Sequence, residues 1–394
     1  MPTSSQAMHY KKLDLRMKEN KTVYLDNAAT TKPNKDVVAL YNEIELNHFG
    51  NANSIHALGV DSSKYLAKAK EKILKAFNLS DYRVILTSSA SEANNLAIKG
   101  TAFNYMGRGK HIITSKIEHP SVLEACKQLE TLFDFKVTYL DVDKNDLVNP
   151  KDLEKAFTNE TNVVSIMAVN NETGAVQPIK EIAKIVHSHP KALLHVDMTQ
   201  AVGKIDIDLN DIDVFTYSAH KINGLKSGGA IVAKNKISYK PLISGGDQEY
   251  GYRAGTSDVA GACALAKATE IALKDRTSNY NHALELKEHL LKSLEGENIV
   301  FNSDKNCSPF IVNFSLLNKK ASVVVEALSL KGIYVSSVSA CHSKREPMSY
   351  VVDAMFHDQS RSKNTIRISF DKDNTFEDVD AFVKEFKNIV RSIQ

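Results

Sequence analysis

Short apolar runs alternate with amphipathic stretches through the first part of the chain. Between several of these runs apolar residues recur at helical spacing, as at Leu66, Ala69 and Ile73. Strand–helix alternation of this kind predicts an α/β fold with a mainly parallel, seven-stranded sheet and helices on both faces. The expected strands cover residues 84–86, 112–113, 137–140, 163–169, 193–196, 214–217 and 230–232.

A second pattern begins near Asp258. The sequence is rich in alanine, leucine and lysine and free of proline as far as Leu294, which predicts one long helix. Further strands and helices are expected over 310–314, 323–330, 333–335 and 366–369, followed by an amphipathic helix at the end of the sequence. We therefore expect an extension over residues 1–22, a large domain over 23–260 and a smaller α+β domain over 261–394.

Composition excludes several classes of protein. The 50 basic residues nearly balance the 47 acidic ones, so we expect neither nucleic-acid binding nor attraction to an anionic membrane. No apolar run approaches the roughly 20 residues of a membrane span, and no signal-peptide core is found. The four cysteines contain no C-x-x-C pair, which argues against a metal site or a disulfide framework and favours the cytoplasm. They are Cys126, Cys263, Cys307 and Cys341.

Polar residues cluster where the predicted strands end, which is where parallel sheets bind ligands. Asp197 ends one strand and Lys221 follows the next. Taken alone, Asp197 and Gln200 could be helix caps and Lys221 a solvated charge. Together, a lysine and a carboxylate are what pyridoxal phosphate (PLP) requires, for its Schiff base and its ring nitrogen. Burial and a neighbouring cation would lower the pKa of such a lysine.

The same edge of the sheet offers a site for a phosphate group. The hydroxyl-rich run Thr87–Asn94 follows a strand and opens a helix, whose N-terminus attracts anions. A second loop, Gly251–Thr256, has glycines that allow either a tight turn or close approach to a ligand. His119 and Asn171 also follow strands; they are either surface and turn residues or groups that contact the cofactor ring.

These residues together resemble the NifS/IscS-type cysteine desulfurases, a group of class V aminotransferase-like PLP enzymes. The resemblance runs from Tyr24–Thr31 to Ile366–Ser369. It implies fold type I, a homodimer and PLP as cofactor. The resemblance implies that Lys221 binds the cofactor covalently, that His119 stacks on the ring and takes part in catalysis, and that Asp197 contacts the ring nitrogen. It further implies that Asn171 and Gln200 lie near the phenolic oxygen and that Arg367, together with Asn171, binds the substrate. The implied phosphate-binding residues are Ala90, Ser91, Ser218, His220 and, across the dimer, Thr256.

Cys341 distinguishes a desulfurase from an aminotransferase. Its neighbours are small, polar or basic, including His342 and Lys344, and these conditions favour a thiolate; the other three cysteines are interpreted as buried filler. The resemblance places the persulfide-forming cysteine at Cys341, in a loop that ends at Tyr350. It implies that L-cysteine is converted to L-alanine and that the sulfur passes to a protein acceptor, either an iron–sulfur scaffold or a tRNA-thiolating enzyme.

Some positions depart from the family pattern, and alternatives stay open. Val338 stands where glycine is frequent, His342 where a small residue is frequent, and Ser91 where threonine is common. A selenocysteine lyase or another class V aminotransferase-like enzyme would share the PLP residues. A non-catalytic binding protein that retains the fold is the remaining alternative.

Overall fold

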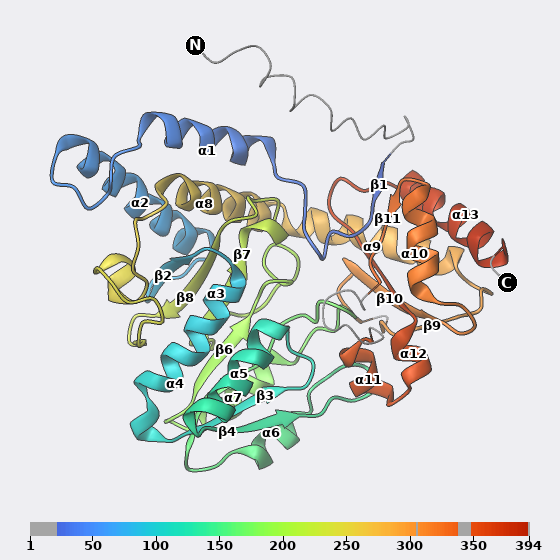
Figure 1. Cartoon of the computed structure of the whole chain (residues 1–394), viewed down its shortest axis with the longest axis horizontal. Coiled ribbons are helices and arrows are strands. Elements are labelled where there is room, and N and C mark those ends of the chain that lie inside the picture. Colours follow the sequence, from blue (N-terminus) through green and yellow to red (C-terminus); the bar gives the residue numbers. More distant parts are fainter. Residues whose placement is uncertain (1–21, 305, 338–347, 393–394) are drawn as a thin grey trace, which may run out of the picture.

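The computed structural model describes residues 22–304, 306–337 and 348–392 of the 394-residue chain (Figure 1). Its main element is a seven-stranded sheet with the order β2-β8-β7-β6-β5-β3-β4. All neighbours pair in parallel except β8, which runs antiparallel to β2 and β7. The strands are β2 (Tyr82–Thr87), β3 (His111–Ser115), β4 (Lys136–Leu140), β5 (Thr161–Ser165), β6 (Leu193–Asp197), β7 (Val214–Ser218) and β8 (Gly229–Lys234). The predicted mainly parallel sheet is confirmed, although β5 ends at Ser165, before the end of the predicted run 163–169.

The central strands are buried on both faces, as expected of a sheet between two helical layers. Successive side chains point to opposite layers: Val214 packs with α3, whereas Phe215 packs in the larger core with α2. The α2 layer contains α2 (Ala57–Ala76), α6 (Pro150–Ala156), α7 (Ile179–His187) and α8 (Val259–Lys274), with α1 (Lys35–Asn47) packed on α2 and α8. The opposite layer contains α3 (Ala90–Asn95), a π-helical turn over Leu96–Gly100, α4 (Thr101–Asn104) and α5 (Pro120–Phe133).

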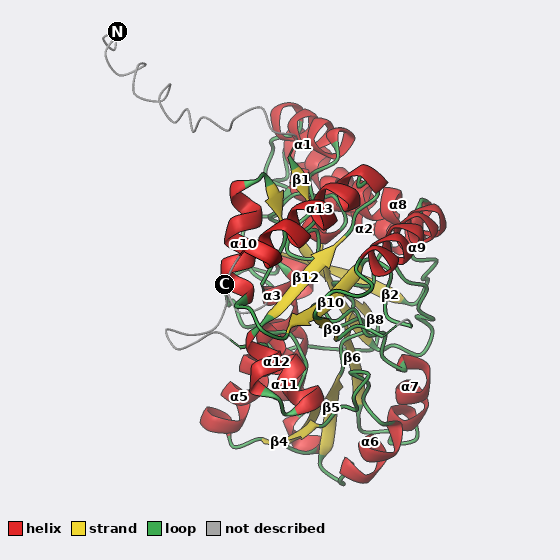
Figure 2. Ribbon diagram, turned by 90° about the vertical axis from the view of Figure 1, so that its right-hand side faces the viewer, coloured by secondary structure: helices red, strands yellow, loops and turns green. Residues whose placement is uncertain are grey.

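A smaller antiparallel sheet, ordered β12-β10-β9, forms a second core. The start of the described chain joins this part, because β1 (Val23–Tyr24) pairs in parallel with β11 (Ile333–Tyr334). Figure 2 shows the small sheet beside the large one, with α11 and α12 nearby. The other elements are β9 (Ile299–Phe301), β10 (Ile311–Leu316), β12 (Thr365–Ser369), α9 (Arg276–Ser293), α10 (Ala321–Leu330), α11 (Tyr350–Phe356), α12 (Gln359–Lys363) and α13 (Phe376–Ser392).

The prediction of one long helix from Asp258 to Leu294 is wrong. The segment forms two helices, α8 and α9, that meet at Asp275, whose φ of −92° and ψ of 5° leave the helical region. Aspartate favours helix ends over helix interiors because its side chain competes for backbone hydrogen bonds. The break lets α8 pack on the large sheet while α9 packs against α13 in the smaller core.

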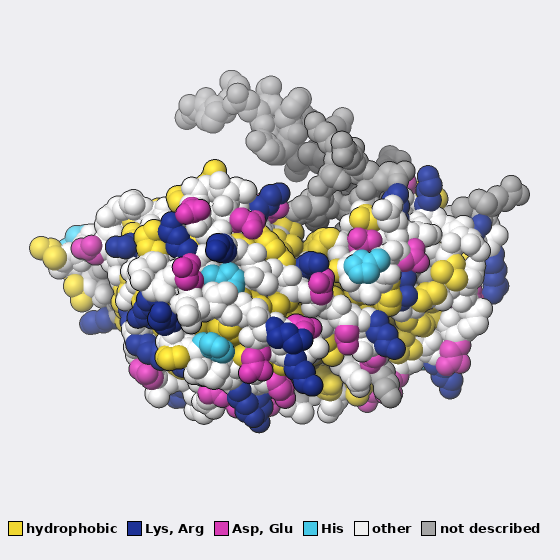
Figure 3. Space-filling view, turned by 90° about the horizontal axis from the view of Figure 1, so that it is seen from below, with side chains coloured by type: hydrophobic (Ala, Val, Ile, Leu, Met, Phe, Trp, Pro, Cys, Tyr) yellow, Lys and Arg dark blue, Asp and Glu magenta, His cyan; other side chains and the backbone are white. Residues whose placement is uncertain are grey.

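The surface is mixed in charge. Figure 3 shows basic and acidic side chains interspersed over the face seen from below in Figure 1. Within the part of the chain that the structure describes, no helix combines the length and the apolar character needed to cross a bilayer.

Candidate active site

Two neighbouring strand ends bring the key residues together. Asp197 is the last residue of β6, and Lys221 lies in the 3-10 turn η4 (Ala219–Lys221) that follows the parallel strand β7. The amine of Lys221 donates to the carbonyl oxygens of Ala28 at 2.6 Å and Ala29 at 2.7 Å. Burial, with a smaller contribution from the positive charge of Arg367, lowers the pKa of Lys221 to about 7. A neutral, nucleophilic amine is therefore available near neutral pH.

A chain of side chains connects Asp197 to His119. Asn94 in α3 donates to Asp197 Oδ2 at 2.8 Å and to Ser121 Oγ at 2.9 Å. Ser121 Oγ in turn lies 2.8 Å from His119 Nδ1. The Asn94 oxygen accepts from the hydroxyl of Thr216 in β7. Residues of β6, β7 and α5 therefore meet at this amide. Asn94 was predicted only as the last residue of the phosphate-binding run, and its contact with Asp197 was not predicted, because only the fold brings the two residues together.

The N-terminus of α3 forms the candidate phosphate site. Ser89 caps the helix, and Ala90 and Ser91 are its first residues. The start of β8 packs closely on this end: a Cβ on Gly229 would lie 2.4 Å from the carbonyl carbon of Ser89. Only glycine fits there, which keeps the backbone of the loop close to the cap.

Two further predicted phosphate residues follow β7. Ser218 Oγ donates to the carbonyl of Gly228 at 3.2 Å, and Gly228 N donates to the carbonyl of Ser88 in the loop before α3. His220 Nδ1 lies 3.2 Å from Thr30 Oγ1. Burial lowers the pKa of His220 to about 4, so its imidazole is neutral near pH 7 and offers one N–H donor.

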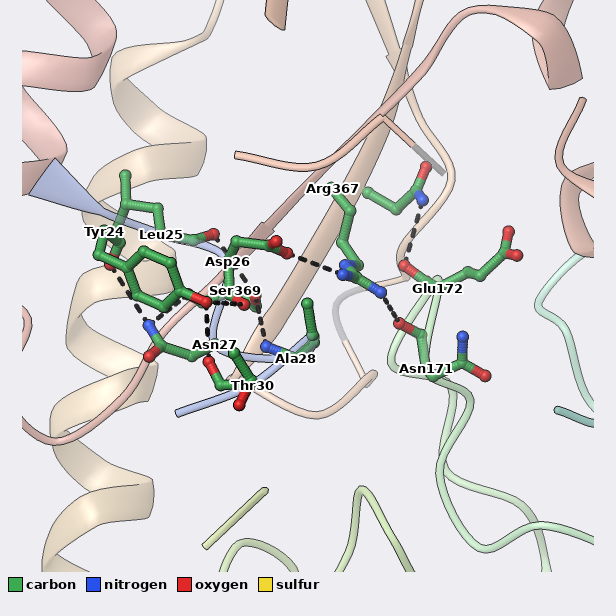
Figure 4. Close-up of polar contacts among 12 residues, drawn as sticks. Tyr24, Leu25, Asp26, Asn27, Ala28, Thr30, Asn171, Glu172, Arg367 and Ser369 are labelled. Atoms are coloured by element: carbon green, nitrogen blue, oxygen red, sulfur yellow. Dashed lines mark hydrogen bonds and ion pairs between the residues drawn. The ribbon is translucent and has the colours of Figure 1, made fainter. Parts of the chain in front are cut away.

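Arg367 lies on β12 of the small sheet, and its guanidinium lies between Asp26 and Asn171 (Figure 4). Its guanidinium donates to Asp26 Oδ1 and to the carbonyl oxygen of Asn171, each at 2.8 Å. Two buried polar atoms beside this arrangement have no hydrogen-bond partner among the described residues, namely Arg367 Nε and Asn171 Oδ1. Buried polar groups are normally satisfied, so a donor and an acceptor left open together indicate a ligand site.

Gln200 follows Asp197 by three residues and lies beside Lys221. Its Nε2 donates to Ala28 O at 2.9 Å, the same carbonyl that accepts from Lys221. Its Oε1 accepts from Lys204 at 3.2 Å. Lys204 is 7% exposed and was not among the predicted site residues, because nothing in the sequence distinguishes it from a surface lysine.

Two buried glutamates adjoin predicted site residues without having been predicted themselves. Glu118 precedes His119, and burial raises its pKa to about 8. Glu172 follows Asn171, and burial raises its pKa to about 7. Their positions next to His119 and Asn171 were visible in the sequence, but their burial was not.

Thr256 has no hydrogen bond to the other predicted site residues in the described part of the chain. It lines a cavity of about 240 Å³ together with Ser88 and Gly229. The loop before it is tied to α3 by an ion pair between Arg253 Nε and Glu92 Oε1 at 2.8 Å. Its implied contact with a partner subunit's phosphate stays a prediction.

Cys341 lies outside the described residues, as do His342 and Val338. The described residues on either side adjoin the site. Ser336 forms a β-bridge with Arg367. Ser349 donates to the carboxylate of Glu172, and the Tyr350 hydroxyl donates to the carbonyl of Glu118 at 2.7 Å. The described residues before position 338 therefore lie beside Arg367, and those after position 347 lie beside Glu118 and Glu172.

The remaining cysteines lie buried and form no disulfide. Burial raises the pKa of Cys263 and of Cys307 to about 11 and also raises the pKa of Cys126. Such thiols are poor nucleophiles at neutral pH. Across the residues described here, no group of three or more histidine, cysteine or acidic side chains is placed to hold a metal ion.

The donor set fits pyridoxal phosphate. A lysine with a lowered pKa, a buried carboxylate at Asp197 and a helix N-terminus are the three anchors that this cofactor requires. Asn171 Oδ1 and Arg367 Nε have no hydrogen-bond partner among the described residues, so both are free to contact a ligand.

Comparisons with known proteins agree with this arrangement. The family described as Aminotransferase class-V matches residues 23–382. The cysteine desulfurase IscS of Dictyoglomus turgidum is 36% identical over 94% of this chain and 95% of its own. That of Methanosarcina thermophila is 37% identical over 95% of this chain and 94% of its own. A solved structure described as a NifS-like protein has a TM-score of 0.88 at 35% identity, covering 94% of this chain and all of that one.

Proposed function

The chain belongs to the class V aminotransferase family and, within it, to the NifS/IscS-type group, and on that premise we propose that it is a PLP-dependent cysteine desulfurase. The products would be L-alanine and a persulfide on Cys341. The observation that supports this best is the convergence of Lys221, Asp197 and Arg367 from three parts of the chain on one site.

We propose a defined role for each cofactor residue. Lys221 binds the cofactor covalently, Asp197 holds a proton on its ring nitrogen, and His119 stacks on the ring. The N-terminus of α3, with Ser218 and His220, holds the phosphate. When bound, PLP supplies an electron sink for the substrate Cα.

Substrate orientation rests on Arg367. A guanidinium binds a carboxylate through two parallel N–H donors, and Nε is still open while Asp26 and Asn171 hold the other end of the group. The substrate carboxylate would accept from this side, with the Asn171 side chain beside it. Its amino group would then point toward Lys221.

Sulfur transfer requires a base and a nucleophile. With a pKa of about 7, Lys221 is suited to take the Cα proton of the substrate. The Cys341 thiolate attacks the substrate sulfur; the S–S bond of the persulfide forms as the Cβ–S bond breaks. The remaining three-carbon fragment takes up protons, to which His119 contributes, and leaves as L-alanine. No external oxidant is needed, because the electron pair of the broken Cβ–S bond stays on the three-carbon fragment, whose Cβ is reduced to a methyl group as the sulfur is oxidised to the persulfide level.

The assembly is proposed to be a homodimer. Several large apolar side chains at the end of α1 and the start of α2 are exposed, and exposed apolar patches mark association surfaces. They include Leu46 (75% exposed), Phe49 (70%) and Ile55 (98%). A partner subunit would also supply Thr256 to the phosphate. We propose a cytoplasmic location and a protein sulfur acceptor, either an iron–sulfur scaffold or a tRNA-thiolating enzyme.

Substitution of Cys341 tests the assignment. Cys341→Ser should bind PLP with the absorption spectrum of the wild type, because no cofactor residue changes, yet release no sulfide from L-cysteine. Cys263→Ala is the matched control and should retain sulfide release, because this thiol is buried in α8. Sulfide release by Cys341→Ser at the wild-type rate would overturn the proposal.

A further inference from the structure

Lys204 is a buried cation with no role in the proposed chemistry. Its Nζ donates to Gln200 Oε1 at 3.2 Å and lies 5.8 Å from the centre of the Phe310 ring. No carboxylate among the described residues lies within ion-pair distance of it, although Asp371 and the like-charged Arg367 are close enough to influence its pKa. Burying an ammonium group without an ion pair costs free energy of folding, so a functional reason for Lys204 is expected.

The contacts of Gln200 permit only one orientation of its amide. A protonated lysine can only donate a hydrogen bond, and a backbone carbonyl can only accept one. Gln200 lies between these two groups, with Lys204 at 3.2 Å from Oε1 and the Ala28 carbonyl at 2.9 Å from Nε2. Burial lowers the pKa of Lys204 to about 8, which leaves the amine mostly protonated at neutral pH. The NH2 group of Gln200 is thereby directed away from Lys204.

The NH2 group of Gln200 faces the amine that would bind the cofactor. Gln200 Nε2 and Lys221 Nζ both donate to the Ala28 carbonyl, at 2.9 Å and 2.6 Å. In PLP the ring hydroxyl stands next to the carbonyl group that Lys221 would attack. A ring held at Lys221 would carry its phenolic oxygen close to this lysine, where the NH2 group of Gln200 would offer it N–H donors.

We propose that Lys204 is a positioning residue that fixes the Gln200 amide with its NH2 group toward the phenolic oxygen of the cofactor. This inference rests on the proposed function. With the amide reversed, Oε1 would face an oxygen that carries negative charge, and one hydrogen bond would be replaced by a repulsion. The positive charge behind the amide adds to this preference.

The test measures the affinity of the apoprotein for PLP by absorption titration. Lys204→Met keeps the apolar stem but removes the donor and the charge, and should weaken binding about tenfold, the value of one hydrogen bond to a charged acceptor. Lys204→Arg restores a donor-only cation and should return binding to within about twofold of wild type. Lys287→Met removes another buried lysine, whose amine donates to the carbonyls of Asp304 and Cys307, and should not change the affinity.

A double-mutant cycle shows whether Lys204 acts through Gln200. In a Gln200→Ala background, Lys204→Met should cause no further loss, because the amide that it orients is gone. An unchanged affinity for Lys204→Met, or the same loss in both backgrounds, would overturn the inference. Failure of the wild type itself to bind PLP would instead overturn the proposed function.

One measurement does not depend on the folding of a variant. The side-chain amide of Gln200 in the ¹⁵N-labelled wild type should shift on addition of PLP, because its N–H groups exchange the Ala28 carbonyl for the phenolic oxygen. An unperturbed Gln200 amide resonance in a PLP-saturated sample would overturn the inference.

Discussion

At the scale of single residues, the groups around Lys221 determine its pKa. Burial and Arg367 lower its pKa to about 7, so the neutral amine predominates above that pH. The rate of covalent attachment of PLP to the apoprotein should therefore rise with pH and level off just above 7. Stopped-flow absorption measures this rate. A midpoint near the ordinary lysine value, about 10.4, would contradict the assignment.

Arg367 should determine recognition of the substrate carboxylate. Lysine cannot reproduce a bidentate pair, so Arg367→Lys should raise KM for cysteine on the order of tenfold or more. The absorption of the bound cofactor should not change, because lysine keeps the positive charge and Arg367 donates to Asp26 and to the backbone carbonyl of Asn171, not to Lys221 or Asp197. Steady-state kinetics with a spectrum of each variant separates the two effects, and an unchanged KM would refute the role.

The elements around the site contain buried acids whose titration affects stability. The pKa of Glu118 is about 8 in the folded protein against an ordinary value of 4.5, so the folded state binds this proton more tightly. Its stabilising contribution is complete below about pH 4.5 and is lost as the pH rises to about 8. Glu118→Gln cannot titrate, so its Tm relative to wild type should increase between about pH 5 and pH 8.5, corresponding to about 1–3 kcal/mol.

Thermal unfolding of both proteins across this pH range checks the prediction. Glu130→Gln, on an exposed position of α5, is the control and should follow the wild type throughout. A Tm difference for Glu118→Gln that is independent of pH would show that the carboxyl does not titrate in this window.

The elements also show what the sequence could predict. Short apolar runs identified all seven strands of the large sheet, because strands such as β6 and β7 are buried on both faces and therefore mostly apolar. The break at Asp275 was missed, since it reflects the docking of α8 and α9 on different cores. Asn94, Lys204 and Glu118 were missed because their roles arise from neighbours distant in the chain.

On the scale of the whole molecule, the arrangement of the two sheets matters most. β12 of the small sheet brings Arg367 to the edge of the large one, and β1 ties the start of the described chain to β11. The division into residues 1–22, 23–260 and 261–394 stays a prediction. The proposed site takes residues from both sheets, so we expect each sheet to be required for substrate binding.

Association of two copies should be visible in solution. Light scattering should give twice the 43.6 kDa mass of one chain. Ile55→Asp together with Phe49→Asp should yield monomers and weaken PLP binding, because a charge opposes burial of these exposed apolar positions and the partner's Thr256 is lost. Leu330→Asp, at an exposed position of α10, is the control. A wild type that is monomeric and binds PLP no more tightly than the double variant would contradict the proposed dimer.

We propose that the buried lysine and the cofactor serve removal of sulfur from cysteine. Anaerobic incubation of the PLP-loaded protein with L-cysteine and a reductant measures this directly. We expect sulfide and L-alanine in equal amounts, with turnover that needs no added keto acid. Amino-group transfer that requires a keto acid, without release of sulfide, would contradict it.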